Sequence, residues 1–167
     1  MHTVLLPLIN YSFTAHAEKP TKPSKAVRKW DGRTPYAVHP LWCATTLLTE
    51  TSLPEDLRMR GAKALLLHDV LEDTTAGLPE GLEPQVVSLV EGMTFASSEE
   101  EMEQVWSRSD EVKLLKLYDK ISNLLDGSWM SHEKKGRYVA YTKRLLGEVE
   151  RDYGLLNIVR IARSLCN

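Results

Sequence analysis

The sequence predicts an all-α protein of about seven to eight helices. Apolar residues recur every three or four positions along several long segments, which is the period of an amphipathic helix. No segment alternates apolar and polar residues between turn signals, which is the pattern of a half-buried strand. Pro and Gly separate the periodic segments, so we expect helices joined by loops.

Length and composition are those of a globular chain, and we expect one domain spanning residues 1–167. Hydrophobic residues make up 43% and charged residues 26% of the chain, close to ordinary globular values. The formal net charge is −2, so no strong basic field is present to recruit nucleic acid. We therefore expect no nucleic-acid partner, and a site for an anion must be built from a local basic cluster.

Cysteine usage and hydropathy indicate a cytoplasmic protein. Cys43 and Cys166 lie far apart and show no CxxC or zinc-type spacing, which favours reduced thiols. No apolar stretch approaches the ~20 residues that cross a membrane, so we expect no membrane partner. Segments 4–9 and 15–17 have the outline of a secretory signal, but no Lys or Arg precedes them and Pro7 interrupts the apolar run.

The first helix is expected from Leu5 to Ala17, with apolar residues and His16 near one face. We interpret His16 as a packing histidine rather than a ligand. The segment from Glu18 to Tyr36 contains three prolines and one glycine, which predicts a loop. This basic loop is either a solvated connector or a phosphate-binding segment. Its basic residues are Lys19, Lys22, Lys25, Arg28, Lys29 and Arg33.

Two helices are expected between residues 40 and 73. Pro40 suits the first turn of a helix that continues to about Thr51, which places His39 at the N-cap edge with its ring free. Ser52 is the candidate cap of the next helix, which we expect to run without a break to about Asp73.

Later helices follow the same kind of periodicity. The glutamates of segment 97–102 are expected to form a solvated face, with Trp106 on the inner side of that helix. The further helices are expected from Pro84 to Met93, from Ser97 to beyond Met102, from Ser109 to Leu125, from Ser131 to Asp152 and from Leu155 to Leu165.

The run from Ala64 to Asp73 is apolar but contains four groups that need a partner when buried. Ionised carboxylates are costly to remove from water, and a metal ion is the simplest compensation. At helical spacing His68 lies over Glu72 and Asp69 lies over Asp73, on neighbouring stripes. The alternative is a buried His–Asp pair with two exposed acids at the end of the helix.

A second acid lies in an apolar helix at Asp119, with Ser122 and Asn123 one turn further on. Together with His39 and with His68 and Asp69 of the central run, this gives two imidazoles and two carboxylates on three helices, whose charges balance a divalent cation. Such an N/O donor set leaves open positions and suits an octahedral ion such as Mn²⁺ or Fe²⁺. A structural zinc site more often uses cysteine. The potential ligands are His39, His68, Asp69 and Asp119.

Three segments, in order, resemble the HD superfamily of metal-dependent phosphohydrolases, whose pattern is H…HD…D. The segments are Arg28 to Pro40, Leu66 to Thr74 and Val112 to Leu124. Within that superfamily the chain is most similar to the hydrolase domain of the Rel/Spo alarmone enzymes, and above all to their small stand-alone relatives. The resemblance covers most of the chain and implies an HD-domain helical bundle.

The resemblance also implies roles for matched residues. His39, His68, Asp69 and Asp119 would hold one Mn²⁺. Glu72 and Asp73 match the pair that orients and deprotonates the attacking water, a task that a carboxylate near a metal can perform. Arg28 and Lys29 match a basic pair beside the nucleotide, and Asn123 matches a polar residue that contacts it. The implied reaction is hydrolysis of a nucleotide 3′-pyrophosphate, such as that of guanosine 3′,5′-bis(diphosphate), with release of pyrophosphate.

Several alternatives stay open at this point. The substrate is alternatively the 2′-phosphate of NADPH or a nucleoside 5′-monophosphate, or the protein senses a nucleotide without turnover. Arg28 is alternatively a solvated loop charge, and Asn123 alternatively forms a helix–helix hydrogen bond. The chain departs from the family where residues 18–27 separate His16 from Arg28. Apolar faces on the later helices could serve a homodimer.

Overall fold

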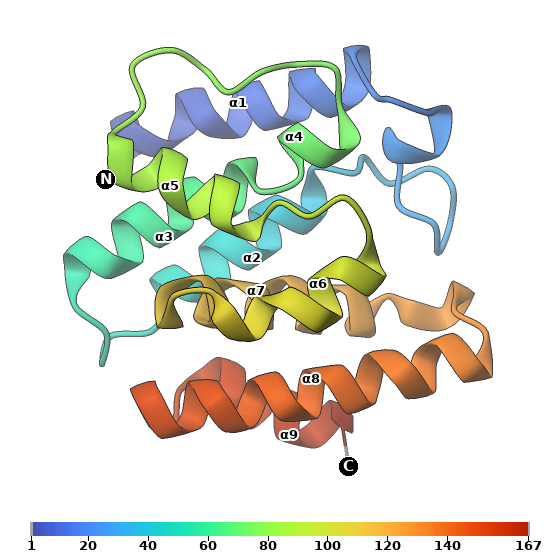
Figure 1. Ribbon diagram of the computed structural model, residues 1–167. Helices are drawn as coiled ribbons and strands as arrows, with labels where there is room; N and C mark the ends of the chain where they lie inside the picture. The colour runs from blue at the N-terminus through green and yellow to red at the C-terminus, as the bar shows by residue number, and fades with distance from the viewer. Residues whose placement is uncertain (1, 167) are drawn as a thin grey trace.

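The computed structural model describes residues 2–166, which form nine α-helices and three short 3-10 helices (Figure 1). No β-strand occurs in this range, so the predicted all-α fold is confirmed. The α-helices are α1 His2–Glu18, α2 Val38–Leu48, α3 Glu55–Leu67, α4 Val70–Asp73, α5 Pro84–Met93, α6 Ser98–Gln104, α7 Asp110–Leu125, α8 His132–Tyr153 and α9 Asn157–Cys166. The 3-10 helices are η1 Pro23–Lys25, η2 Val105–Ser107 and η3 Gly127–Trp129.

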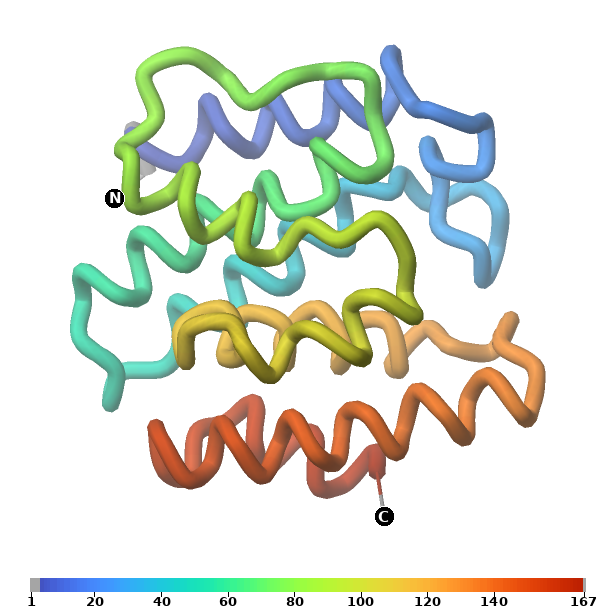
Figure 2. Tube along the Cα trace, viewed as in Figure 1, coloured from blue at the N-terminus to red at the C-terminus, as the bar shows by residue number. Residues whose placement is uncertain are grey.

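Helices α2, α3 and α7 pack on one another and form the centre of the molecule. Helices α1 and α4 lie on one side of this centre, and α8 and α9 cover α7 on the other side (Figures 1 and 2). Helix α5 packs on α3 and α7, beside the segment that leads into α6. Among the described residues, no helix combines the length and the apolar composition that a membrane span requires.

Helix α7 is buried on most of its circumference, although it carries charged residues. Lys116, Asp119 and Lys120 are at most 8% exposed, alongside wholly buried leucines. A helix buried all round is normally apolar, and a charge placed there needs a partner. The centre of the fold therefore contains a polar site.

The prediction of one continuous helix from residue 52 to residue 73 is wrong at His68 and Asp69. Helix α3 ends at Leu67 and α4 begins at Val70, so His68 and Asp69 lie at a bend between two helices. The bend lets α3 bury its apolar residues against α2 and α5, while α4 packs on α1. Counting α3 and α4 as one predicted helix leaves eight, in line with the expected number.

Two predicted helix starts also differ. Helix α2 begins at Val38, so His39 lies in its first turn and is 2% exposed, rather than lying at the N-cap edge with a free ring. Pro40 does occupy that first turn, as expected from its missing N–H. Ser52 does not cap α3, because Pro54 takes the N-cap position and no side chain caps that helix.

The starts of three later helices follow the prediction. Ser97, Ser109 and Ser131 each accept a hydrogen bond from the backbone N–H three residues on and so begin α6, α7 and α8. Helix α9 is capped differently: Glu50, two residues beyond the end of α2, accepts the N–H groups of Asn157 and Ile158 at 3.0 and 2.9 Å.

The predicted solvated face of the acidic segment holds only in part. Glu99 and Glu103 are exposed, but Glu101 is 6% exposed and points into the molecule. The reason is electrostatic, because two buried lysines of α7 draw this carboxylate inward. Trp106 lies on the inner side, as expected, with its ring edge-on to that of Tyr141.

Candidate metal centre and active site

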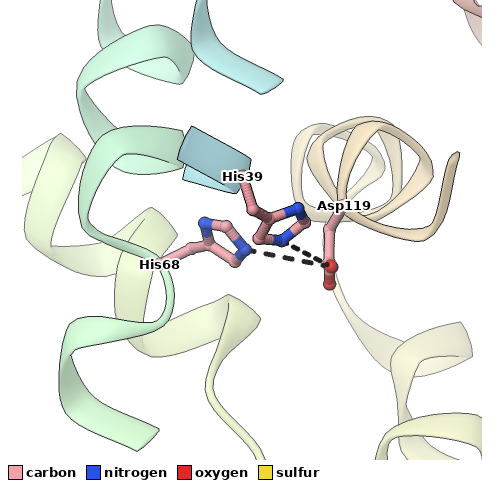
Figure 3. Close-up of side chains that lie close together, drawn as sticks. All are labelled: His39, His68 and Asp119. Carbon is pink, nitrogen blue, oxygen red and sulfur yellow. Dashed lines mark ion pairs between the residues drawn. The ribbon is translucent and has the colours of Figure 1, made fainter. Parts of the chain in front are cut away.

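Two imidazoles and a carboxylate converge between α2, the α3–α4 bend and α7 (Figure 3). The rings of His39 and His68 point toward Asp119, and the nearest ligand atoms of the three residues lie within 4.8 Å of one another. The Nε2 atoms lie 3.3 Å (His39) and 3.9 Å (His68) from Asp119 Oδ1. All three residues are buried.

Asp69 lies beside this group. Its Oδ2 atom is 3.5 Å from His39 Nε2 and 3.2 Å from His68 Nε2. The same oxygen accepts a hydrogen bond from the Tyr36 hydroxyl at 2.8 Å, which fixes the carboxylate. The structure thus brings all four predicted metal ligands into one cluster.

The histidine hydrogen bonds fit a bound metal ion. His68 Nδ1 lies 2.7 Å from the carbonyl oxygen of Leu65, which can only accept, so Nδ1 carries a proton and Nε2 is the nitrogen left to face an ion. His39 Nδ1 is 2.8 Å from Ser122 Oγ. Both Nε2 atoms are buried and make no hydrogen bond to a residue in the range 2–166. Metal-binding histidines show this arrangement, with one nitrogen held by the protein and the other free for the ion. A divalent ion would satisfy these nitrogens and balance the two carboxylates.

The buried carboxylates of Asp69 and Asp119 also favour a cation at this position. Burial alone would lower the pKa of His68, but the neighbouring Asp69 and Asp119 carboxylates raise it to about 10. Burial opposes ionisation of Asp119, yet Lys120, Lys116 and the histidines hold its pKa well below the ordinary value. The carboxylates therefore stay charged, and either a proton or a metal ion must occupy the space between them.

Glu72 and Asp73 line a cavity of about 850 Å³, whose wall also includes Asp69 and Asp119. Burial and the charge of Asp69 raise the pKa of Glu72 to about 7. Glu72 Oε1 accepts the N–H of Phe95 at 2.8 Å. Asp73 Oδ1 is 2.5 Å from Lys25 Nζ, while burial and Asp69 raise its pKa. A carboxylate that titrates near neutrality is suited to accept a proton from water.

Asp119 is oriented by three groups of its own helix. Its Oδ2 lies 3.4 Å from Lys116 Nζ and 3.0 Å from Lys120 Nζ, and its Oδ1 accepts the amide N–H of Asn123 at 2.7 Å. Sequence reasoning missed the two lysines. The signal was available, since both interrupt the apolar run on either side of Asp119.

The predicted substrate-binding residues lie at the edge of the cavity. Arg28 is 5% exposed, so it is no solvated loop charge. Its guanidinium donates to both carboxylate oxygens of Asp126, at 2.8 and 3.0 Å, and to Asn123 Oδ1 at 2.8 Å. Lys29 is exposed, with Nζ 4.4 Å from the centre of the Trp129 ring. Arg28 and Asn123 are thus in contact, and all three residues line the cavity.

The residues that separate His16 from Arg28 reach the site. Thr21 N donates to the carbonyl of Asp73 at 2.8 Å, and the 3-10 helix η1 brings Lys25 to the Asp73 side chain. His16 is buried and stacks on Tyr36 with ring centres 4.6 Å apart. Residues 18–27, where the chain departs from the family pattern, therefore contribute contacts to Asp73.

Comparison with known proteins places the chain in a family, although no family model matches it. It is 32% identical to the Drosophila melanogaster guanosine-3′,5′-bis(diphosphate) 3′-pyrophosphohydrolase MESH1 over 136 aligned residues, which cover 71% of this chain and 73% of that protein. The Danio rerio MESH1 is 32% identical over 134 residues, covering 74% of this chain and 68% of that protein. The Mus musculus MESH1 is 33% identical over 124 residues, covering 68% and 65%.

A solved structure has the same fold. It belongs to a metazoan SpoT ortholog described as hydrolysing ppGpp and acting in starvation responses. The two chains superimpose with a TM-score of 0.71, over 96% of this chain and 92% of the other, at 23% identity. The sequence similarity to the three MESH1 proteins, on an HD-type helical fold with its His39–His68–Asp119 cluster, shows that this chain belongs to the MESH1 family of Rel/Spo-type hydrolases in the HD superfamily.

Proposed function

We propose that the protein hydrolyses the 3′-pyrophosphate of guanosine 3′,5′-bis(diphosphate), with one Mn²⁺ held by His39, His68, Asp69 and Asp119. The observation that carries this proposal is that two of the proposed metal ligands, Asp69 and Asp119, line the same lysine-rich cavity as Glu72. The names of the three MESH1 relatives support the choice of substrate.

The metal supplies the chemistry that side chains lack. When bound, a divalent ion would lower the pKa of a water molecule toward neutrality and polarise a phosphate oxygen. The nitrogen and oxygen donors favour Mn²⁺ over a structural zinc ion, whose sites more often contain cysteine.

Glu72 and Asp73 of α4 act on the attacking water. Glu72 takes a proton from the attacking water, and its hydrogen bond from Phe95 N keeps the carboxylate in place. The water oxygen forms a bond to phosphorus as the bond between phosphorus and the ribose 3′-oxygen breaks. The proton taken by Glu72 is returned, directly or through solvent, to the 3′-oxygen, and pyrophosphate leaves. Asp73, paired with Lys25, supports the orientation of the water.

Two adjoining cavities suit the two halves of a nucleotide. The larger one contains Lys25, Lys29 and Lys134, which would bind phosphate groups. The smaller one, of about 420 Å³, has two tryptophans in its wall, Trp30 and Trp42, together with apolar and polar side chains. Arg28 lines both cavities. We place the base in the smaller cavity, the phosphates in the larger one, and Arg28 between them.

The test is a substrate panel with the full-length protein and Mn²⁺. Guanosine 3′,5′-bis(diphosphate), NADPH and a nucleoside 5′-monophosphate are supplied separately, and released pyrophosphate and phosphate are measured independently. We expect pyrophosphate from the first substrate, with a loss of at least about 100-fold in Asp69→Ala. Asp152→Ala, an exposed acid on α8, is the matched control and keeps full activity.

Other outcomes would overturn the proposal in defined ways. Phosphate released from NADPH or from the monophosphate, without pyrophosphate from the first substrate, would change the substrate. Tight binding of the bis(diphosphate) without turnover would identify a nucleotide sensor.

A further inference from the structure

A carboxylate of the acidic helix α6 lies between two buried ammonium groups in the wall of the larger cavity. Glu101 Oε2 accepts from Lys116 Nζ at 3.0 Å and from Lys120 Nζ at 2.9 Å. Its Oε1 accepts the Tyr141 hydroxyl at 2.9 Å. Glu101 is 6% exposed, whereas Glu103 of the same helix is exposed.

The same two lysines also contact the metal-cluster residue Asp119, on the side away from the histidines. Two ammonium groups are therefore shared by two carboxylates, and the array has no net charge. Removing one carboxylate would leave one uncompensated positive charge in the cavity wall. A buried charge of this kind attracts an anion strongly, because little water screens it.

The arrangement of donors around Glu101 is one that suits a phosphate group. Two ammonium groups and one hydroxyl converge on two oxygens at distances of 2.8 to 3.0 Å. Phosphate carries more charge and more acceptor oxygens than a carboxylate, so it can compete for the same donors. Glu101, Lys116 and Lys120 line the cavity that also contains Asp69 and Asp119.

Buried residues flank helix α6 on both sides, Phe95 before it and Val105 after it. Val105 is wholly buried just beyond its C-terminal end, and Trp106 packs on Tyr141 and under the guanidinium of Arg144, 3.6 Å from the ring centre. The residues 96–99 at its N-terminal end are exposed.

We propose that Lys116 and Lys120 form an anion subsite of the active-site cavity, that Glu101 is its resident anion, and that a phosphate group competes with Glu101 for it. Glu101 is then a specificity-determining residue, because it weakens the binding of polyanions at this subsite. The inference rests on the proposed function for the identity of the anion as a phosphate.

The experiment measures the affinity of inorganic pyrophosphate by calorimetry, using the full chain loaded with Mn²⁺ and free of excess metal. Glu101→Gln keeps the size of the side chain and removes its charge, so we expect pyrophosphate to bind at least about tenfold more tightly. Glu103→Gln, the matched control on the same helix, changes the affinity by less than about twofold. Adding Lys116→Met to Glu101→Gln removes the gain, because it removes the uncompensated charge.

A second variant keeps the proposal testable if Glu101→Gln unfolds. Tyr141→Phe retains all four charges and removes only the hydrogen bond that holds Glu101, so a gain of about two- to threefold is expected. A folded Glu101→Gln protein that binds pyrophosphate no more tightly than Glu103→Gln would overturn the proposal, as would the absence of any gain in Tyr141→Phe. Binding of pyrophosphate requires no turnover, so failure of the substrate panel bears on the proposed function alone.

Discussion

The side chain of Glu72 is poised between two charge states at neutral pH. Burial removes the carboxylate from water and the nearby Asp69 repels its charge, which together raise its pKa to about 7. The fraction of Glu72 present as a carboxylate therefore increases as the pH rises through this value. A bound dication would favour the ionised form and move the midpoint downward.

We predict that kcat/KM rises with pH and levels off above about pH 7, since the base must be deprotonated to accept a proton. Glu72→Gln should lose at least about 100-fold in kcat/KM and the rising limb of the profile. Glu103→Gln, an exposed glutamate, should keep both. The measurement is initial rate against pH at saturating Mn²⁺. A Glu72→Gln enzyme with an unchanged rising limb would show that another group is the base.

The sequence identified the polar residues of the site that interrupt an apolar helical run. His68 and Asp69 stand in an apolar run, and Asp119 in another, so burial without a partner was improbable for them. Tyr36 and Ser122, which hold Asp69 and His39, were not assigned these roles. Their partners lie on other elements, and distance along the chain carries no information about such contacts.

Gly61 of α3 lies where this helix packs closely against α2 and α7. A Cβ atom on Gly61 would lie 2.7 Å from Leu47 Cδ2 and 3.1 Å from Leu115 Cδ2, and both leucines are fully buried. Gly136 on α8 faces open space at the surface. An alanine methyl group would therefore be crowded at position 61 and unhindered at position 136.

We predict that Gly61→Ala lowers the free energy of unfolding by about 1–3 kcal/mol, because the methyl group overpacks the junction. Gly136→Ala should raise it by about 0.4–1 kcal/mol, because alanine loses less backbone entropy on folding. Urea unfolding followed by far-UV circular dichroism measures both. Equal effects of the two substitutions would contradict the close packing of α3 against α2 and α7.

The helices themselves were predictable where a local signal exists. Serine caps with acidic residues after them marked the starts of α6, α7 and α8. The bend between α3 and α4 was not predictable, because the apolar period continues across His68 and Asp69. Neither was the Glu50 cap of α9, which joins residues more than 100 positions apart.

At the scale of the whole molecule, the cluster connects parts of the chain that are remote in sequence. α2, the α3–α4 bend and α7 each contribute to it, and these elements form the centre of the fold. Two buried carboxylates repel each other at this point, so a bound cation should stabilise the entire molecule. The order of the helices and their all-α class followed from periodicity. The packing of α6 over the lysines of α7 did not, because the acidic segment has the composition of a solvated face.

Titration of the metal-depleted protein with Mn²⁺ tests the metal site, with binding followed by calorimetry and stability by thermal unfolding. We predict one ion per chain and a stabilisation of about 2.7 kcal/mol at a free Mn²⁺ concentration of 100 Kd. Both effects should disappear in Asp119→Ala and persist in Asp152→Ala. A protein that binds no ion, or whose melting temperature Mn²⁺ leaves unchanged, would contradict the claim that these imidazoles and carboxylates form a metal site.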